Sequence, residues 1–166
     1  MQTVLIKQYY YYHPKRTFDE VYGHGLNPYI PTPKEYNGQS ISTNSPNVYV
    51  HDCVFRSCTN TGNGGALYCS GSVIKLLVEQ SSFISCRTSS SNGGGIFFQN
   101  TNNGECVLCR VCGFDCLTTT SSSVGQFARI RTKNMNNVND SSFTHSYNTN
   151  SSTQNTLRLE CDHILC

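Results

Sequence analysis

Charged side chains are scarce in this 166-residue chain, where they make up 13% of the residues. The formal net charge is only +2, which is too small to indicate a nucleic acid or a membrane surface as a partner. Long apolar stretches are also missing, since no run of about 18 apolar residues occurs that would span a bilayer. Residues 1–7 hold three consecutive apolar side chains, fewer than the core of an export signal needs. The sequence therefore predicts neither a transmembrane helix nor a signal peptide in this chain.

Helical periodicity is a further absence, because no segment keeps an apolar helical period over three turns. Hydrophobic residues make up 37% of the chain, and Ser, Thr, Asn and Gly dominate the remainder. Such a composition suits a narrow core, to which each short strand contributes one or two inward side chains and in which neighbouring units stack. The aromatic content of 11% argues against disorder. We expect one domain built from β-strands.

Cysteine is abundant, with ten residues in the chain. This number is high for a protein of the reducing cytosol, whereas an exported protein pairs some of its cysteines as disulfides. The last residues, 160–166, lie within what is predicted to be a strand. We therefore expect the chain to be a fragment or a truncated copy of a longer product.

An internal repeat is the most informative feature. The sequence Gly64-Gly-Ala-Leu67 recurs as Gly94-Gly-Ile-Phe97, and weaker copies occupy residues 124–127 and 154–157. The second positions of the four copies follow one another at steps of 30 residues. In the first three copies these positions are Gly65, Gly95 and Gly125.

A second motif keeps the same period. It starts at four phenylalanines that are 28, 31 and 29 residues apart, namely Phe55, Phe83, Phe114 and Phe143. A cysteine follows two or three residues after each of the first three, at Cys58, Cys86 and Cys116. Because equivalent side chains of stacked coils lie above one another at about 4.8 Å, we expect one buried column of phenylalanines and a second column of thiols.

The two motifs predict an all-β fold, a right-handed parallel β-helix with coils of about thirty residues that is incomplete at its C-terminus. Each unit is too short for a propeller blade, and the leucine-rich repeat consensus is absent. We assign residues 46–166 to the repeats and residues 1–45, which are rich in Tyr and Pro, to an N-terminal segment that caps the open end of the solenoid. Thr17-Phe-Asp-Glu20 has the spacing of a capping box, which predicts a helical turn. A contact of the tyrosines with a carbohydrate or a partner is the alternative.

The Gly-Gly-Ala-Leu and Phe-x-x-Cys elements resemble the paired Gly-Gly-Ala-Ile and Phe-x-x-Asn motifs of polymorphic outer-membrane proteins. This chain departs from that pattern by placing Cys58, Cys86 and Cys116 where the family has Asn. It is more similar to the Cys- and Asn-rich β-helix surface proteins of parasitic protists. The resemblance covers residues 46–166 and implies a pectin-lyase-like right-handed β-helix at a cell surface. It also implies a membrane anchor that we do not find in this sequence.

One cysteine run has the spacing of a bacterial iron–sulfur motif, with Cys106, Cys109, Cys112 and Cys116. Leu117 stands where a proline usually follows, and no second run completes a two-cluster protein. In the repeat, Cys116 falls in the row of Cys58 and Cys86, and Cys112 in the row of Cys53. We therefore predict stacked thiols with one or two disulfides and no cofactor; a zinc site with a nearby histidine is the alternative.

Catalytic signatures are few. His51, His145 and His163 lie in or beside strands, where we expect them to be solvated, and Gly-x-Ser-x-Gly is absent. Four acidic residues near equivalent repeat positions are expected to form a solvent-facing ladder, with a calcium site as the alternative; they are Asp52, Glu79, Asp115 and Asp140. Asn139-Asp-Ser141 and Asn150-Ser-Ser152 are sequons, relevant only in a secretory lumen.

Two functions are compatible with these patterns. The first, which we favour, is a non-enzymatic cell-surface module that presents polar turns to a protein or glycan partner in adhesion. The second is a degenerate polysaccharide lyase or hydrolase on the same fold. An enzyme is expected to gather acidic and basic side chains in one groove, whereas an adhesive shaft is expected to present Ser, Thr and Asn.

Overall fold

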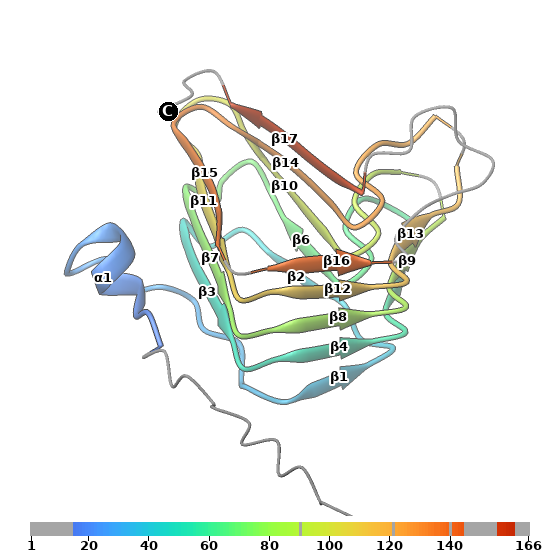
Figure 1. Ribbon diagram of the computed structural model, residues 1–166. Coiled ribbons are helices and arrows are strands. Elements are labelled where there is room, and N and C mark those ends of the chain that lie inside the picture. Colours follow the sequence, from blue (N-terminus) through green and yellow to red (C-terminus); the bar gives the residue numbers. More distant parts are fainter. Residues whose placement is uncertain (1–14, 90, 121, 140, 145–155, 162–166) are drawn as a thin grey trace, which may run out of the picture.

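The structure is a computed structural model that describes residues 15–89, 91–120, 122–139, 141–144 and 156–161. Within these residues the chain winds into a parallel β-solenoid of about three turns, with about 29 residues per turn. Figure 1 shows the coils stacked on one another along a single axis. The predicted β-fold with stacked coils of about thirty residues is confirmed.

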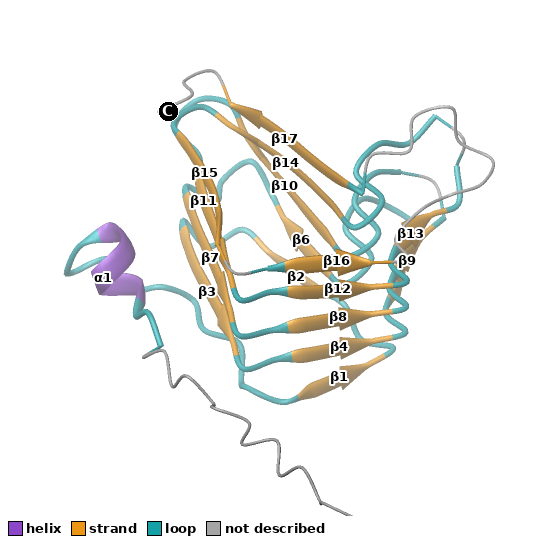
Figure 2. Ribbon diagram, in the orientation of Figure 1, coloured by secondary structure: helices purple, strands orange, loops and turns teal. Residues whose placement is uncertain are grey.

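Four parallel sheets form the walls of the solenoid (Figure 2). The first contains β3 (Asn47–His51), β7 (Lys75–Glu79), β11 (Glu105–Cys109) and β15 (Met135–Asn139). The second contains β1 (Glu35–Asn37), β4 (Val54–Arg56), β8 (Ser82–Ile84), β12 (Cys112–Phe114) and β16 (Ser142–Thr144). The third contains β2 (Ile41–Thr43), β6 (Leu67–Cys69), β10 (Ile96–Asn100), β14 (Ala128–Thr132) and β17 (Leu157–Cys161). The fourth is short and contains β5 (Thr59–Asn60), β9 (Arg87–Thr88) and β13 (Leu117–Thr118).

Three corners of each complete coil adopt a left-handed backbone conformation, and equivalent corners lie above one another. The corner residues of the first and second rows have φ between 43° and 55°, namely Asp52, Gln80 and Arg110, then Ser57, Ser85 and Asp115. The third row consists of Gly64, Gly93 and Gly125, with φ of 68–70°. A Cβ at these glycines would lie 2.4, 2.1 and 2.4 Å from backbone oxygens three residues ahead, so that only glycine fits this tight corner.

The predicted row of Gly65, Gly95 and Gly125 is wrong in register. Strand pairing aligns Leu67 with Ile96 and Ala128, which places Gly64, Gly93 and Gly125 in one row. Gly95 N instead donates to Phe127 O over 2.7 Å, and Gly65 N donates to Gly93 O over 3.1 Å.

The repeat length varies because two segments of the coil vary, namely the polar segment that follows the fourth wall and the turn that leads from the third wall to the first. The segments that follow β5, β9 and β13 occupy residues 61–63, 89–92 and 119–124. They become longer from one coil to the next, while the strands before and after them stay in register. A constant step of 30 residues therefore cannot align both motifs at once.

The phenylalanine column forms at two of its predicted positions. Phe55 and Phe83 are fully buried, and their rings stack with centroids 4.7 Å apart and planes 11° apart. Tyr36 extends this stack by one coil, 5.0 Å from the Phe55 centroid. The prediction for Phe114 is wrong, since it pairs with Ile84 in the sheet and is 43% exposed. The side chain of Phe143 lies outside the described part of the structure.

Gly113 occupies the place that Phe114 was predicted to fill, because it pairs with Phe83 on one side and with Phe143 on the other. The space above the Phe83 ring is taken by Phe127, which is fully buried and packs edge-on against Phe83 at 5.6 Å. A Cβ on Gly113 would lie 2.7 Å from Cδ2 of Phe127. A ring from another wall thus replaces the missing column member.

The stack of coils begins earlier than predicted. β1 pairs with β4, and β2 pairs with β6, so that residues 35–43 already belong to the solenoid. The sequence placed the start at residue 46 because the glycine and phenylalanine motifs are absent from this first coil. Tyr36 fills the aromatic position there, although the repeat has phenylalanine.

The helix α1 (Phe18–Tyr22) is capped as predicted, with reciprocal hydrogen bonds between Thr17 and Glu20. It covers a side wall, however, and not the open end of the solenoid (Figure 1). The reason is an outward-facing row of apolar side chains on β3, β7 and β11 that needs cover. Phe18 packs against this row, which consists of Tyr49, Leu77 and Val107 together with Cys109.

Substitution of Phe83 by Ala is expected to lower the free energy of unfolding by ~3–5 kcal/mol, because it opens a cavity between the rings of Phe55 and Phe127 in a thin core. Phe114→Ala is the matched control, since the sequence motif treats the two residues alike while Phe114 is 43% exposed. Urea unfolding monitored by circular dichroism measures both. Equal losses for the two variants would contradict the register described above.

Gly113→Ala is expected to destabilise the protein by roughly 1–3 kcal/mol, the cost typical of overpacking a core. The added methyl group would collide with the Phe127 ring. In the double variant Gly113→Ala, Phe127→Leu the smaller side chain relieves this collision, and the two losses should therefore be less than additive in a double-mutant cycle. Additive losses would show that the two residues do not share this space.

Candidate functional site

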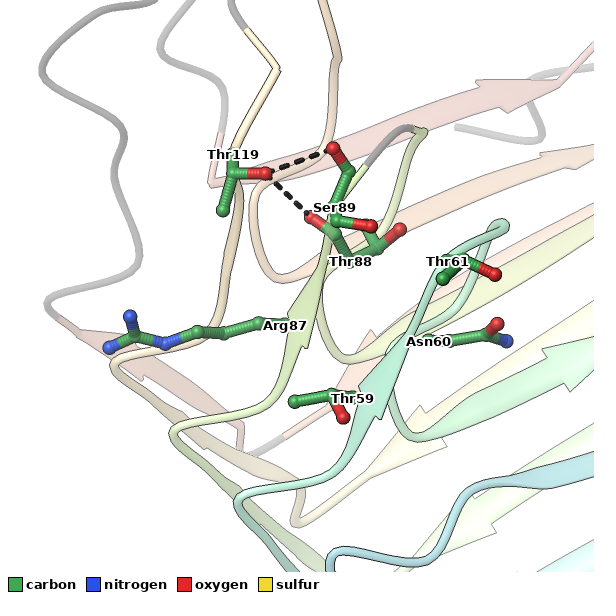
Figure 3. A pocket seen from close by; sticks show the side chains of 7 residues that line it. All are labelled: Thr59, Asn60, Thr61, Arg87, Thr88, Ser89 and Thr119. Carbon is green, nitrogen blue, oxygen red and sulfur yellow. Dashed lines mark hydrogen bonds between the residues drawn. The ribbon is translucent and has the colours of Figure 1, made fainter.

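The fourth wall carries a groove on its surface. The groove encloses about 350 Å³ and lies over β5 and β9 and beside the end of β13. Figure 3 shows its lining from close by. Seven residues from three successive coils contribute, namely Thr59, Asn60, Thr61, Arg87, Thr88, Ser89 and Thr119.

Strand alternation decides which of these side chains reach solvent. In the middle row, Asn60 is half-buried, while Thr88 and Thr118 are buried. The Thr88 hydroxyl donates to Gly62 O, and Gln126 Oε1 accepts from Thr118 N over 2.9 Å. Because successive side chains of a strand point to opposite faces, the groove-lining residues on either side of this row are exposed, namely Thr59, Thr61, Arg87, Ser89 and Thr119. These hydrogen bonds of the middle row thus help to hold the groove in shape.

The exposed positions of the groove carry hydroxyls and one guanidinium group. Thr59, Thr61 and Ser89 are exposed along it. The Thr119 hydroxyl donates to Ser89 O over 3.0 Å. Arg87 forms an ion pair with Asp115 over 3.4 Å, which balances the charge of its guanidinium group. It offers hydroxyl groups beside threonine methyl groups.

The sequence patterns did not reveal this groove. Its residues lie between the Phe-x-x-Cys and Gly-Gly motifs and belong to neither of them. The available signal is the pattern of every second residue after the cysteine of the repeat, with Thr59-x-Thr61 after Cys58 and Arg87-x-Ser89 after Cys86. This alternation becomes visible only once the cysteines are aligned.

A second polar cluster fastens the segment that carries α1 to the first wall. Glu79 is fully buried and forms an ion pair with Arg110. Its Oε1 also accepts a hydrogen bond from Arg16 N over 2.8 Å. The Tyr49 hydroxyl lies 2.8 Å from Arg16 O and 3.3 Å from Glu79 Oε2. Burial, with the nearby charge of Glu79, raises the pKa of Tyr49, which keeps its hydroxyl protonated.

Next to this cluster, Lys15 forms an ion pair with Asp52. Nδ1 of His51 lies 2.9 Å from Asp52 Oδ2 and 2.7 Å from Lys15 Nζ. Burial opposes ionisation of Asp52, but the hydrogen bonds from Lys15 and His51 outweigh it and lower its pKa. The ionised carboxylate therefore holds the start of the segment on the wall.

The predicted acidic ladder does not form. Glu79 pairs in the sheet with His51 and Cys109, whereas Asp52 occupies the corner that Gln80 and Arg110 occupy in the next coils. Asp115 belongs to a different row of corners, and Asp140 lies outside the described residues. Glu79 also faces the α1 segment and is not solvated. A shift of one residue along a strand reverses the side-chain direction, and this separates the carboxylate of Asp52 from that of Glu79.

The four cysteines that have the spacing of an iron–sulfur motif lie in different parts of the structure. Cys106 and Cys116 are buried in the core, Cys109 lies under α1, and Cys112 is exposed. Cys112 aligns with Ser82 and Val54, so its predicted alignment with Cys53 is wrong. Within the described ranges, no group of three or more His, Cys, Asp or Glu side chains is arranged to hold a metal ion. Cys58, Cys86 and Cys116 share one buried row, as predicted.

The remaining predicted positions are placed only in part. His51 is a half-buried member of the Asp52 cluster, whereas His145, His163 and Asn150 lie outside the described residues. Asn139 ends β15, and its side chain is not described.

None of the helices in the described part of the chain is sufficiently long and apolar to cross a membrane. No family model, curated protein or solved structure matches this chain.

Attachment of the α1 segment is expected to weaken in acid. Since the pKa of Asp52 is lower in the folded protein, its contribution is complete above the unfolded value of about 3.9 and is lost as the pH falls through the folded value. Hydrogen–deuterium exchange of residues 15–26 should therefore accelerate below about pH 4 relative to exchange in the core strands. In Asp52→Asn this acid step should be smaller; an unchanged step would contradict the role of Asp52.

Proposed function

We propose that this chain is a non-enzymatic β-solenoid module of a cell-surface protein, which binds a glycan partner in adhesion through the groove over β5 and β9. The observation that supports the binding role is the groove itself, which three successive coils build and which exposes hydroxyl and guanidinium side chains. The surface location is supported by the resemblance of the repeat motifs and by the cysteine content.

The wall beneath the groove favours binding because it is preorganised. Ser89 N donates to Asn60 O over 3.1 Å, and Thr119 N donates to Thr88 O over 3.0 Å, so that the lining residues are held at fixed spacing. A rigid site loses little conformational entropy when a ligand binds. The volume of about 350 Å³ is within the range that small-ligand pockets occupy.

The chemistry of the lining favours a neutral, hydroxyl-rich ligand. Arg87 is already balanced by Asp115, so that an anion gains less from it than from an isolated guanidinium. Hydroxyls of Thr59 and Ser89 can donate to and accept from sugar hydroxyls, and the adjacent threonine methyl groups suit the C–H faces of a sugar ring. A short peptide of a protein partner is the other ligand that such a groove accommodates.

The alternative function, a degenerate polysaccharide lyase or hydrolase, has less support. It was motivated by an acidic ladder that includes Asp52 and Glu79, and these two residues occupy different rows. Glu79 is moreover fully buried beneath the α1 segment, where a polysaccharide has no access to it. The binding role therefore remains the proposal.

The groove is tested by filling it. Ser89→Tyr should weaken binding to immobilised neutral oligosaccharides at least tenfold, which corresponds to ~1.4 kcal/mol. Ser72→Tyr is the matched control, since Ser72 is an exposed serine outside the groove, and it should bind like the unmodified chain. Equal affinity of both variants would place the ligand elsewhere. Cleavage of a polyuronate by the unmodified chain would favour the enzyme instead.

A further inference from the structure

Three cysteines occupy one position in three successive coils. Cys58, Cys86 and Cys116 each lie between a residue of the second wall and a residue of the fourth wall that pair in register. Arg87 N donates to Cys58 O over 2.8 Å, and Leu117 N donates to Cys86 O over 3.0 Å. Adjacent members of this thiol column are thus one strand apart, which corresponds to about 4.8 Å between Cα atoms.

The sulfur atoms of the thiol column face inward and are fully buried. Each thiol donates to a carbonyl of the coil beneath it: Cys58 to Tyr36 O over 3.4 Å, Cys86 to Phe55 O over 3.5 Å and Cys116 to Phe83 O over 3.3 Å. The thiol of Cys86 is close enough to the thiols of Cys58 and Cys116 for each to influence the ionisation of its neighbour. The middle sulfur therefore has a sulfur neighbour on each side.

This spacing is compatible with a covalent bridge. Disulfides join cysteines with Cα atoms about 4.4–6.8 Å apart, and the strand spacing is inside that range. We propose that the thiol column is an oxidation site, at which Cys86 forms one disulfide with either Cys58 or Cys116. The two bridges exclude each other because both use the sulfur of Cys86. The inference concerns the core of the solenoid and does not rest on the proposed binding function.

The oxidant that we propose is a small disulfide such as oxidised glutathione. The thiolate of one column cysteine attacks its S–S bond, which yields a mixed disulfide and releases one glutathione thiolate. The second cysteine then attacks the protein sulfur of the mixed disulfide, so that the protein S–S bond forms and a second glutathione leaves. Two electrons pass from the protein to the glutathione disulfide, and the two thiol protons end on the two glutathiones.

The timing of this oxidation follows from burial. Hydrogen bonding to Cys116 and burial together raise the pKa of Cys86 to about 12, and the thiolate is the reactive form. The folded column should consequently oxidise slowly, whereas a chain that folds in an oxidising compartment forms the bridge before the core closes. The bridge would tie two adjacent coils, and a solenoid depends on that nearest-neighbour contact.

The experiment is to refold the full chain from denaturant in a glutathione redox buffer, to block free thiols with N-ethylmaleimide and to map the disulfide-linked peptides by mass spectrometry. The expected result is a mixture of Cys58–Cys86 and Cys86–Cys116 chains, with one column thiol blocked in every chain. Cys58→Ser should retain only the second bridge, and Cys116→Ser only the first. Cys112→Ser is the control, since Cys112 is exposed and outside the column, and it should leave the pattern unchanged.

Cys86→Ser should abolish both bridges. If this variant does not fold, the unmodified chain still decides the question, because its oxidised form should unfold at a higher urea concentration than its reduced form. Blocking of all three column thiols after oxidative refolding would overturn the proposal. So would a disulfide map in which Cys86 is joined mainly to a cysteine outside the column.

Discussion

Vertical register is the constraint on which the rest of this structure depends. Each coil forms its backbone hydrogen bonds with the coils above and below, so every residue of a wall must find its equivalent one strand away. The left-handed corners keep this register, because equivalent corners repeat the same backbone conformation. At Gly64, Gly93 and Gly125 the corner is so tight that a side chain would meet backbone atoms ahead of it. Strand length and wall position follow from where these corners fall.

The interior shows how such a fold tolerates an imperfect repeat. Gly113 contributes no ring to the aromatic column, and the ring of Phe127 occupies that space instead. At the other end of the column, Tyr36 stands in for phenylalanine. The core therefore has to be filled in each coil, but the side chain that fills it can come from different positions of the chain. Side walls are governed by the same rule, since the outward apolar row around Tyr49 and Leu77 is covered by α1.

The sequence was sufficient to predict the fold class, the coil length and the buried row of cysteines, because these depend on periodic side chains. It also predicted the cap formed by Thr17 and Glu20, which is a local pattern. It was not sufficient for Phe114, which lies one residue away from the column, since a single shift along a strand turns a side chain from core to solvent. The groove was missed for another reason: Thr59 and Ser89 carry no motif of their own and come together only through stacking.

The unequal polar segments that follow β5, β9 and β13 have a consequence for the evolution of this molecule. They lie between strands that remain in register, so residues can be inserted there without disturbing either the strands or the core. They also flank the groove. Duplication of coils can therefore be accompanied by free variation of these segments, much as loops on a constant framework diversify in other recognition proteins. A lineage of such proteins can change what it recognises while its scaffold stays the same.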